Sequence, residues 1–442
     1  MASPITRLLN QMAEHGAVRF YVKWLAPNDN SKNQVYLGGG FGALNIIPHG
    51  PVENDESSVA GSVRERAKAK VRFYWIDERG LSRAPDAQLI LYPKYPEVRM
   101  SGFLRGAERA PGDLMRSRDV GRVLFLGICA DGRVIGHVAG NHQPIVHALH
   151  DVANSLTVTG VFLDLEAVRQ DGADPKLAML AMLGRIYRKG WISSQKLGSD
   201  GRRLPYKAQN GGGYTLESEL GISPNGYAGP DYMGWEVKQY SVNDFVRYTA
   251  KSPVTLMTPE PTGGVYKDQG VEAFLRRYGY PDKAGRPDRI NFGGKYVNGM
   301  GFDPNTGLAL RITGYDTLNG KITDVGGAIE LRDKSDEIAA SWGFGGVIEH
   351  WNRKHAKAVY VPSLKRSPPT EYHFGDIVKV CEDTDVLLFL KALALGVVYY
   401  DPGIKMEGAG AGKPVTKRRS QFRINHKSLS DLYQRTEISK LI

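Results

Sequence analysis

Cysteine is scarce in this chain of 442 residues, which contains only Cys129 and Cys381. The two lie far apart in sequence and form no Cys-x-x-Cys pair, so neither a disulfide framework nor a zinc knuckle is indicated. Such low cysteine usage fits a protein that works in a reducing cytoplasm.

Long apolar runs are also missing. No stretch reaches the roughly 20 residues that a membrane-spanning helix needs. The segment from Met1 to Gly16 lacks the apolar core and the cleavage site of a signal peptide. These absences predict a cytoplasmic protein that has no membrane partner.

Positive charge, by contrast, is in excess. The formal net charge is +11 and the isoelectric point is about 9.3. Lysine and arginine are spread through both halves of the chain, which predicts a polyanionic partner and two basic surfaces. The length predicts two domains, or three, each with its own core.

The first 165 residues are rich in β patterns. Runs of β-branched and aromatic residues stand between turn formers, at residues 18–25, 71–76, 88–92, 122–128 and 134–138. Helical patterns are confined to residues 5–15 and 144–155. We therefore predict an N-terminal domain over residues 1–165 that is a small, mostly antiparallel barrel or sandwich.

The second domain mixes helices and strands. Asp174 and Pro175 suit the start of a helix, so we place a linker at residues 166–175 and a catalytic domain at residues 176–442. Strands are expected at 254–258, 358–361 and 396–400, and helices at 177–187, 336–354 and 385–395. This mixture predicts an α/β or α+β fold.

Residues 230–238 carry the most informative chemistry. Tyr232 and Gly234 predict a tight reversal that brings Asp231 toward Glu236, and alternation along a strand puts Glu236 and Lys238 on one face. Carboxylates bind a hard cation such as Mg²⁺, the metal activates water, and a lysine offsets charge on a phosphodiester. On these residues alone, a hairpin edge with solvated charges fits as well.

The sequence segments that flank residues 230–238 strengthen the nuclease interpretation. From residue 176 onward the chain resembles the MvaI/BcnI family of restriction endonucleases, a PD-(D/E)xK group of α/β proteins related to the MutH nickase. The matching phrases are residues 213–217 with 220–221, 231–238, 255–261 and 350–355 before 360–361. The resemblance implies that Asp231 and Glu236 bind Mg²⁺ and that Lys238 orients the attacking water. It also implies that Glu217 supports the metal or the lysine.

The N-terminal 165 residues resemble, more weakly, the effector domain of restriction enzyme EcoRII, which is a B3-like pseudobarrel with two DNA-embracing arms. The resemblance rests on residues 20–29, 34–37 and 98–106. The side chains in or near the arms are of types that contact bases and phosphates: Lys23, Asn28, Asp29, Asn30, Lys32, Gln34, Lys94, Arg99 and Arg105. Ordinary polar hairpin tips would have a similar composition.

A third basic stretch runs from Lys413 to Asn425, with basic residues interleaved with Phe422 and Ile424. We predict a groove-lining hairpin, or alternatively a solvated edge strand. The residues expected to contact DNA there are Arg418, Arg419, Arg423 and His426. His350 and His355 are five residues apart, which is the wrong spacing for a zinc helix and favours phosphate contact or helix termination.

Together the two resemblances imply a monomeric type IIE restriction endonuclease that recognises 5′-CCWGG in double-stranded DNA with both domains. Mg²⁺ is the expected cofactor, and a cognate methyltransferase that protects the host genome is the expected partner. Two alternatives remain: a MutH-like nicking enzyme, and a DNA-binding regulator whose nuclease centre is inactive.

Overall fold

The computed structural model describes residues 3–27, 34–58, 65–168, 174–198, 200–222 and 232–441. The chain divides into two compact units, Met1–Ala181 and Met182–Ile442, which are called here the N-terminal and C-terminal units. The division falls inside helix α4 (Pro175–Arg188). In the described part of the chain, no helix is both long and apolar enough to cross a membrane.

The described strands of the N-terminal unit form two sheets. The seven-stranded sheet has the order β11-β12-β1-β9-β10-β5-β6, and the five-stranded sheet has the order β2-β8-β7-β4-β3. Among their pairings, β10 with β5 is parallel and the others are antiparallel, so the mostly antiparallel prediction is confirmed. The strand bounds are β1 Ala17–Trp24, β2 Val35–Gly39, β3 Glu53–Asn54, β4 Ala67–Lys70, β5 Arg72–Asp77, β6 Gly80–Ala84, β7 Gln88–Tyr92, β8 Glu97–Ser101, β9 Val123–Cys129, β10 Arg133–Ala139, β11 Val158–Thr159 and β12 Phe162–Asp164.

The core of this unit lies between the seven-stranded sheet and two helices. The predicted helices are confirmed as α1 (Pro4–Glu14) and α3 (Pro144–Ala153). Ser3 caps α1 by accepting a hydrogen bond from the backbone amide of Thr6 at 3.1 Å, which satisfies one of the helix's unpaired N–H groups. Apolar side chains of α1, α3 and β9 form one buried cluster. Every residue of β9 is buried, as expected for a central strand covered on both faces.

A buried arginine ties the loops at one end of this sheet together. Arg122, which is 1% exposed, donates from Nε to the carbonyl of Asp119 at 2.9 Å, and from its Nη atoms to Leu114 at 2.5 Å and Ala26 at 3.1 Å. Burial lowers the pKa of this guanidinium. A buried charge is tolerated only when its hydrogen-bonding capacity is satisfied, and here three backbone carbonyls satisfy it.

Replacing Arg122 should therefore destabilise the N-terminal unit. In an Arg122→Met variant the three carbonyls lose their donor, and we expect the free energy of unfolding to fall by roughly 2–4 kcal/mol. Urea unfolding followed by tryptophan fluorescence measures this change. The matched control is Arg79→Met, because Arg79 is exposed and its loss should cost under about 0.5 kcal/mol. Equal effects in both variants would contradict the tethering role of Arg122.

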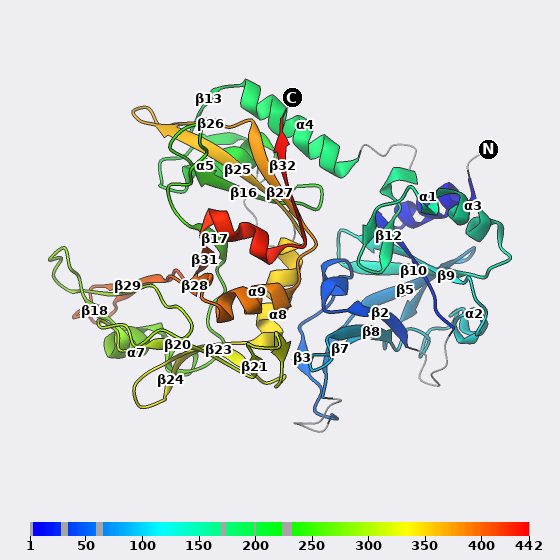
Figure 1. The fold of residues 1–442 in the computed structure, drawn as a ribbon, viewed down its shortest axis with the longest axis horizontal. Coiled ribbons are helices and arrows are strands. Elements are labelled where there is room, and N and C mark those ends of the chain that lie inside the picture. The colour runs from blue at the N-terminus through cyan, green and yellow to red at the C-terminus, as the bar shows by residue number, and fades with distance from the viewer. Residues whose placement is uncertain are drawn as a thin grey trace. The chain divides into compact units, whose positions relative to one another are not determined.

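The C-terminal unit is built on a six-stranded sheet. Its order is β13-β26-β25-β27-β32, and β16 pairs with β25 in parallel, with Glu236 opposite Ala358 and Ser241 opposite Ser363. Figure 1 shows β16, β25 and β27 side by side. The bounds are β13 Trp191–Ser193, β16 Glu236–Ser241, β25 Lys357–Arg366, β26 Glu371–Phe374, β27 Ile377–Glu382 and β32 Arg435–Lys440. The mixture of parallel and antiparallel pairs with helices confirms the expected α/β character.

The C-terminal unit also contains smaller sheets. Their orders are β14-β15, β17-β31-β28, β18-β19-β29-β30, β20-β23-β24 and β21-β22. The strand bounds are β14 Gln195–Leu197, β15 Arg203–Pro205, β17 Val254–Met257, β18 Tyr280–Pro281, β19 Arg289–Gly293, β20 Ala309–Thr313, β21 Tyr315–Asp316, β22 Lys321–Ile322, β23 Ala328–Arg332, β24 Ile338–Gly343, β28 Val398–Tyr400, β29 Gly403–Glu407, β30 Val415–Lys417 and β31 Phe422–Ile424. The helices are α5 Gly211–Glu219, α6 Val265–Asp268, α7 Gly270–Tyr278, α8 Phe344–His355 and α9 Val386–Ala394.

Two predictions about this unit are wrong. The single helix expected at residues 336–354 is strand β24 followed by helix α8, because Ile338 to Gly343 pair with β23 and the helix begins only after Gly343. The hairpin expected at residues 413–425 does not form either. β30 pairs with β29, whereas β31 pairs with β17 and β28, so this basic segment passes from one sheet to another.

Candidate active site

A pocket of about 450 Å³ lies against β16 in the C-terminal unit. Three of the four residues proposed from sequence as catalytic line it, namely Glu217, Glu236 and Lys238. The fourth, Asp231, lies outside the described residues. The other residues that line the pocket are Asn210, Gly213, Tyr214, Thr255, Leu256, Met257, Thr258 and His350.

Helix α5 supplies one wall of this pocket. Asn210 immediately precedes the helix. Gly213, Tyr214 and Glu217 lie within the helix, three, four and seven residues after Asn210. Residues at these spacings lie on one face of a helix, so the phrase that surrounds Glu217 presents a continuous surface to the pocket. Glu217 is half-buried on this face.

A glycine lets α5 approach β16 closely. A Cβ atom on Gly212 would lie 2.8 Å from Oε1 of Gln239 and 3.1 Å from the ring of Tyr372. Gln239 cannot move aside freely, since its amide donates to the hydroxyl of Ser363 at 2.7 Å. At Gly213, by contrast, an added Cβ would meet nothing within 4 Å.

The end of α5 is held by a buried carboxylate. Glu219 has a side chain that is only 2% exposed. It accepts from Nε2 of Gln195 at 2.7 Å, pairs with Arg203 at 3.1 Å and also binds Lys189. Because these donors come from β14, β15 and the residue after α4, Glu219 fixes the position of the helix that carries Glu217.

Glu236 and Lys238 form an ion pair on β16. Lys238 Nζ donates to Glu236 Oε1 at 2.7 Å, and their side chains are 18% and 5% exposed. The predicted shared face is confirmed, because both side chains line the same pocket. A carboxylate with so little exposure to water needs a positive partner, and the lysine provides one.

The predicted reversal before Glu236 is also confirmed. The backbone amides of Tyr232 and Trp235 each donate to the other's carbonyl, at 2.9 and 2.8 Å. The two residues between them, Met233 and Gly234, have φ values of 48° and 82°. Positive φ at both central positions is the geometry of a type I′ turn. A methionine in this region costs roughly 1–2 kcal/mol, so the turn before Glu236 is strained.

The donor chemistry of the pocket fits a hard divalent cation. Glu217 and Glu236 both line it, and carboxylate oxygens are the ligands that Mg²⁺ prefers. Among the described residues, no three histidine, cysteine, aspartate or glutamate side chains form a metal-binding group. Asp231, the remaining metal ligand implied by sequence, lies outside those residues.

The basic segment near β31 has a mixed environment. Arg418 and Arg419 are exposed, as a DNA contact requires. Arg423 is half-buried; it pairs with Asp401 at 2.6 Å and donates to the carbonyl of Pro253 at 2.6 Å. DNA contact by all three arginines stays a prediction.

His426 stacks on Tyr240 with the ring centroids 4.0 Å apart. Burial, and next the nearby charge of Lys379, lower the pKa of His426 to about 4. The imidazole is therefore neutral at pH 7 and has no positive charge to offer a phosphate. Its predicted role in DNA binding would have to be that of a neutral donor or acceptor.

In the N-terminal unit, the described DNA-binding candidates have partners of their own. Arg99 pairs with Glu97 at 2.8 Å and donates to Gln34 at 3.2 Å, and Lys94 pairs with Glu65 at 3.1 Å. Lys23 donates to the carbonyl of Trp24 at 3.2 Å, and burial lowers its pKa. Arg105 pairs with Asp86 at 3.1 Å. The candidates Asn28, Asp29, Asn30 and Lys32 lie outside the described residues.

Sequence reasoning missed several residues of the pocket. Tyr214 and the threonines at 255 and 258 belong to phrases that were matched as a family resemblance, but no role was given to them. The helical spacing from Asn210 to Glu217 was the available signal for the α5 wall. No local pattern connects α5 to β17 or to His350 of α8, because only the tertiary fold brings these elements together.

Residues 180–433 match the model of the MvaI/BcnI restriction endonuclease family. The chain belongs to this family. The matched region lies almost wholly in the C-terminal unit, which therefore has the MvaI-type restriction endonuclease fold, and it contains every described residue of the pocket. Family membership makes the chain a site-specific DNA endonuclease, that is, a DNA-cleaving hydrolase.

Solved structures of restriction endonuclease MvaI are similar to this chain. MvaI in complex with its cognate DNA substrate is 18% identical, with a TM-score of 0.46 over 60% of this chain and 98% of that chain. MvaI in the absence of DNA is 17% identical, with a TM-score of 0.33 over 61% of this chain and 98% of that chain. No curated protein matches the chain. The assignment therefore rests on the family match.

The packing of α5 on β16 can be tested with two adjacent glycines. Gly213→Ala should raise the free energy of unfolding by roughly 0.5–1 kcal/mol, because glycine is costly inside a helix and the added methyl group meets no atom. Gly212→Ala should lower it by about 1–3 kcal/mol, because the methyl group overlaps Gln239 and Tyr372. Thermal and urea unfolding of both variants measure the difference. If both substitutions stabilise the protein, the close contact is absent.

His426 should make the protein less stable in mild acid. Its folded pKa is about 4 and its ordinary value is 6.5, so the unfolded chain takes up this proton at a higher pH than the folded chain does. The stability linked to neutral His426 is then complete above pH 6.5 and is lost as the pH falls toward 4. Between pH 7 and 5, the free energy of unfolding of a His426→Gln variant should fall by about 1 kcal/mol less than that of the unmodified protein. The control is the exposed His147→Gln, which should follow the unmodified protein.

Proposed function

We propose that this protein is an Mg²⁺-dependent type II endonuclease that hydrolyses phosphodiesters at a specific site in double-stranded DNA. One observation carries the proposal: the ion-paired Glu236 and Lys238 line a single pocket with Glu217, inside the region that matches the family. The net charge of +11 agrees with a polyanionic substrate.

Each residue of the pocket has a proposed task. Asp231 and Glu236 would hold Mg²⁺, and Glu217 would support the metal or the lysine from α5. When bound, the metal would supply a water of lowered pKa and neutralise charge on the phosphate. Lys238, fixed by Glu236, orients the attacking water and places an ammonium where negative charge grows in the transition state. The products are a 5′-phosphate and a 3′-hydroxyl.

We further propose that the N-terminal unit is an effector domain of the B3 pseudobarrel type, similar to that of EcoRII. It would bind one copy of 5′-CCWGG and stimulate cleavage of another copy by the C-terminal unit. Such a pairing resembles the type IIE enzyme UbaLAI. A single Asp…Glu-x-Lys centre in the sequence favours a monomer that cuts the two strands in succession, and a cytoplasmic enzyme of this kind needs a methyltransferase that protects the host DNA.

Cleavage of supercoiled plasmids with no, one or two 5′-CCWGG sites tests the proposal, in Mg²⁺ at low salt with the ends mapped by sequencing. We expect cutting at the site, faster on the two-site plasmid or after addition of a short cognate duplex. If the cleavage rate does not depend on a second site, the effector role is excluded and the nuclease assignment is kept. Nicking at another sequence would indicate a MutH-like enzyme, and tight binding without any cleavage would indicate a regulator.

Lys238→Ala tests the assignment of the catalytic centre. Loss of an electrostatic contact to the transition state should lower the cleavage rate at least about 10²–10³-fold, while duplex binding, measured by fluorescence anisotropy in EDTA, persists. The matched control is Lys251→Ala, because Lys251 is exposed and does not line the pocket. Cleavage at the normal rate by Lys238→Ala would show that the catalytic lysine lies elsewhere.

A further inference from the structure

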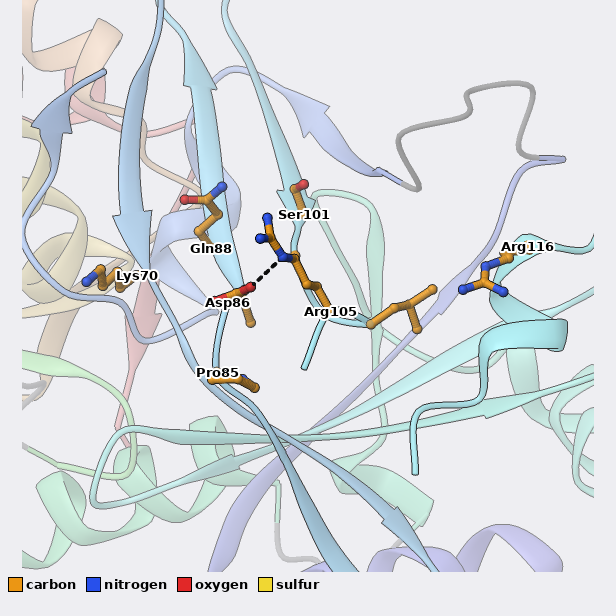
Figure 2. A pocket seen from close by; sticks show the side chains of 10 residues that line it. Lys70, Pro85, Asp86, Gln88, Ser101, Arg105 and Arg116 are labelled. Atoms are coloured by element: carbon orange, nitrogen blue, oxygen red, sulfur yellow. Dashed lines mark ion pairs between the residues drawn. The ribbon is translucent and has the colours of Figure 1, made fainter. Parts of the chain in front are cut away.

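A second pocket, of about 800 Å³, lies in the N-terminal unit. Its lining is mostly polar: three cations, one carboxylate, one amide and one hydroxyl come from different elements. In Figure 2, Asp86 and Arg105 lie in the middle, between Lys70 on one side and Arg116 on the other. The full lining is Lys70, Pro85, Asp86, Ala87, Gln88, Ser101, Gly102, Leu104, Arg105 and Arg116.

The floor of this pocket is a cross-strand row on the five-stranded sheet. Lys70 of β4 stands opposite Gln88 of β7, and Gln88 stands opposite Ser101 of β8. Side chains directly opposite on adjacent strands project from the same face. The row therefore places an ammonium, an amide and a hydroxyl next to one another, and Lys70 and Gln88 lie outside the arm segments proposed from sequence.

The loop that carries Arg105 is anchored on both sides. At Gly102, with φ of +73°, an added Cβ would lie 1.9 Å from the carbonyl oxygen of Asp86, so only glycine allows this approach. The carbonyl of Phe103 accepts from Nε1 of Trp75 at 2.7 Å. Further along, Arg109 pairs with Asp77 at 2.8 Å. Arg105 is thus presented from a fixed backbone, although its side chain is 86% exposed.

The backbone that carries the third cation, Arg116, is also anchored. Arg116 is the last residue of helix α2 (Gly112–Arg116), and the buried Arg122 donates to the carbonyl of Leu114 within that helix at 2.5 Å. In the part of the chain that the structure describes, neither Lys70 nor Arg116 forms an ion pair. The one ion pair of the pocket, Arg105 with Asp86, is exposed on both sides and is therefore weak.

We infer that this pocket binds the phosphate backbone of duplex DNA, with Lys70, Arg105 and Arg116 as the phosphate contacts. The inference rests on the proposed effector function and extends it, because it adds Lys70 and Arg116 to the DNA contacts proposed from sequence. Cations that outnumber carboxylates displace counterions from DNA when they bind its phosphates, and the anchored backbone keeps Arg105 and Arg116 at the pocket. Asp86 pairs with the guanidinium of Arg105. In the proposed complex a phosphate binds the same guanidinium.

Hydrogen–deuterium exchange of the full chain in EDTA locates the contact directly. A short duplex with one 5′-CCWGG site should slow exchange in residues 84–90, 99–106 and 112–117. An Arg105→Ala/Arg116→Ala double variant should lose this protection and keep the protection around residues 210–258. The matched control is Arg79→Ala, an exposed arginine of the same unit that does not line the pocket, and it should behave as the unmodified protein does.

The salt dependence of stimulation gives a second readout. The duplex concentration that half-maximally stimulates plasmid cleavage rises with salt, with a slope set by the number of phosphate contacts. The slope on logarithmic axes should fall by about 1 for each cation removed, and so by about 2 in the double variant. An unchanged slope would overturn the phosphate role of these residues.

The exchange experiment separates this inference from the proposed function. Protection of residues 20–29, 34–37 and 98–106 without protection of residues 84–90 and 112–117 would overturn the pocket and leave the effector domain intact. A lack of protection anywhere in the N-terminal unit would overturn the pocket and the effector function together. If inorganic phosphate alone protects the pocket segments equally well, the ligand of the pocket is a small anion and not the DNA backbone.

Discussion

The parallel pairing of β16 with β25 is the constraint on which the candidate active site depends. This pairing sets the register of Glu236 and Lys238 opposite Ala358 and Tyr360, so both chemical groups stand on one face of a buried strand. A shift by one residue would turn both away from the pocket. The ion pair between them satisfies a carboxylate that is nearly inaccessible to water, and the same pair supplies the charge that the proposed chemistry needs.

The elements around β16 hold this arrangement in place. Gly212 allows α5 to lie against the strand, and Glu219 ties the end of that helix to its neighbours. The strained turn at Met233 leads the chain into β16. Local strain of this kind persists only where the surrounding structure determines it. In the N-terminal unit, Arg122 and the anchored loop at Gly102 fix exposed cations in a similar way.

Much of the architecture could be predicted from local patterns. The β runs of the N-terminal unit, the terminal helix capped by Ser3, and the helix after Asp385 all match the structure, because their periodicity and capping residues act within a few positions of the chain. The helix expected at residues 336–354 failed because Ile338 to Gly343 pair with β23, a contact that no local pattern contains. The hairpin expected at 413–425 failed because β30 pairs with the strand just before it, β29, whereas β31 pairs with β28 and with the distant β17.

The sequence by itself determined which chemical groups are present and how they are spaced along the chain. The carboxylates and the lysine of residues 231–238, the excess of positive charge and the phrases of the endonuclease family are all visible without coordinates. Only the tertiary structure decided which of these groups meet. It brought Glu217 to Glu236 and Lys238, placed His426 on Tyr240 where burial keeps it neutral, and gathered Lys70, Arg105 and Arg116 around one pocket. Burial and proximity depend on contacts between distant segments, and these arise only when the whole chain folds.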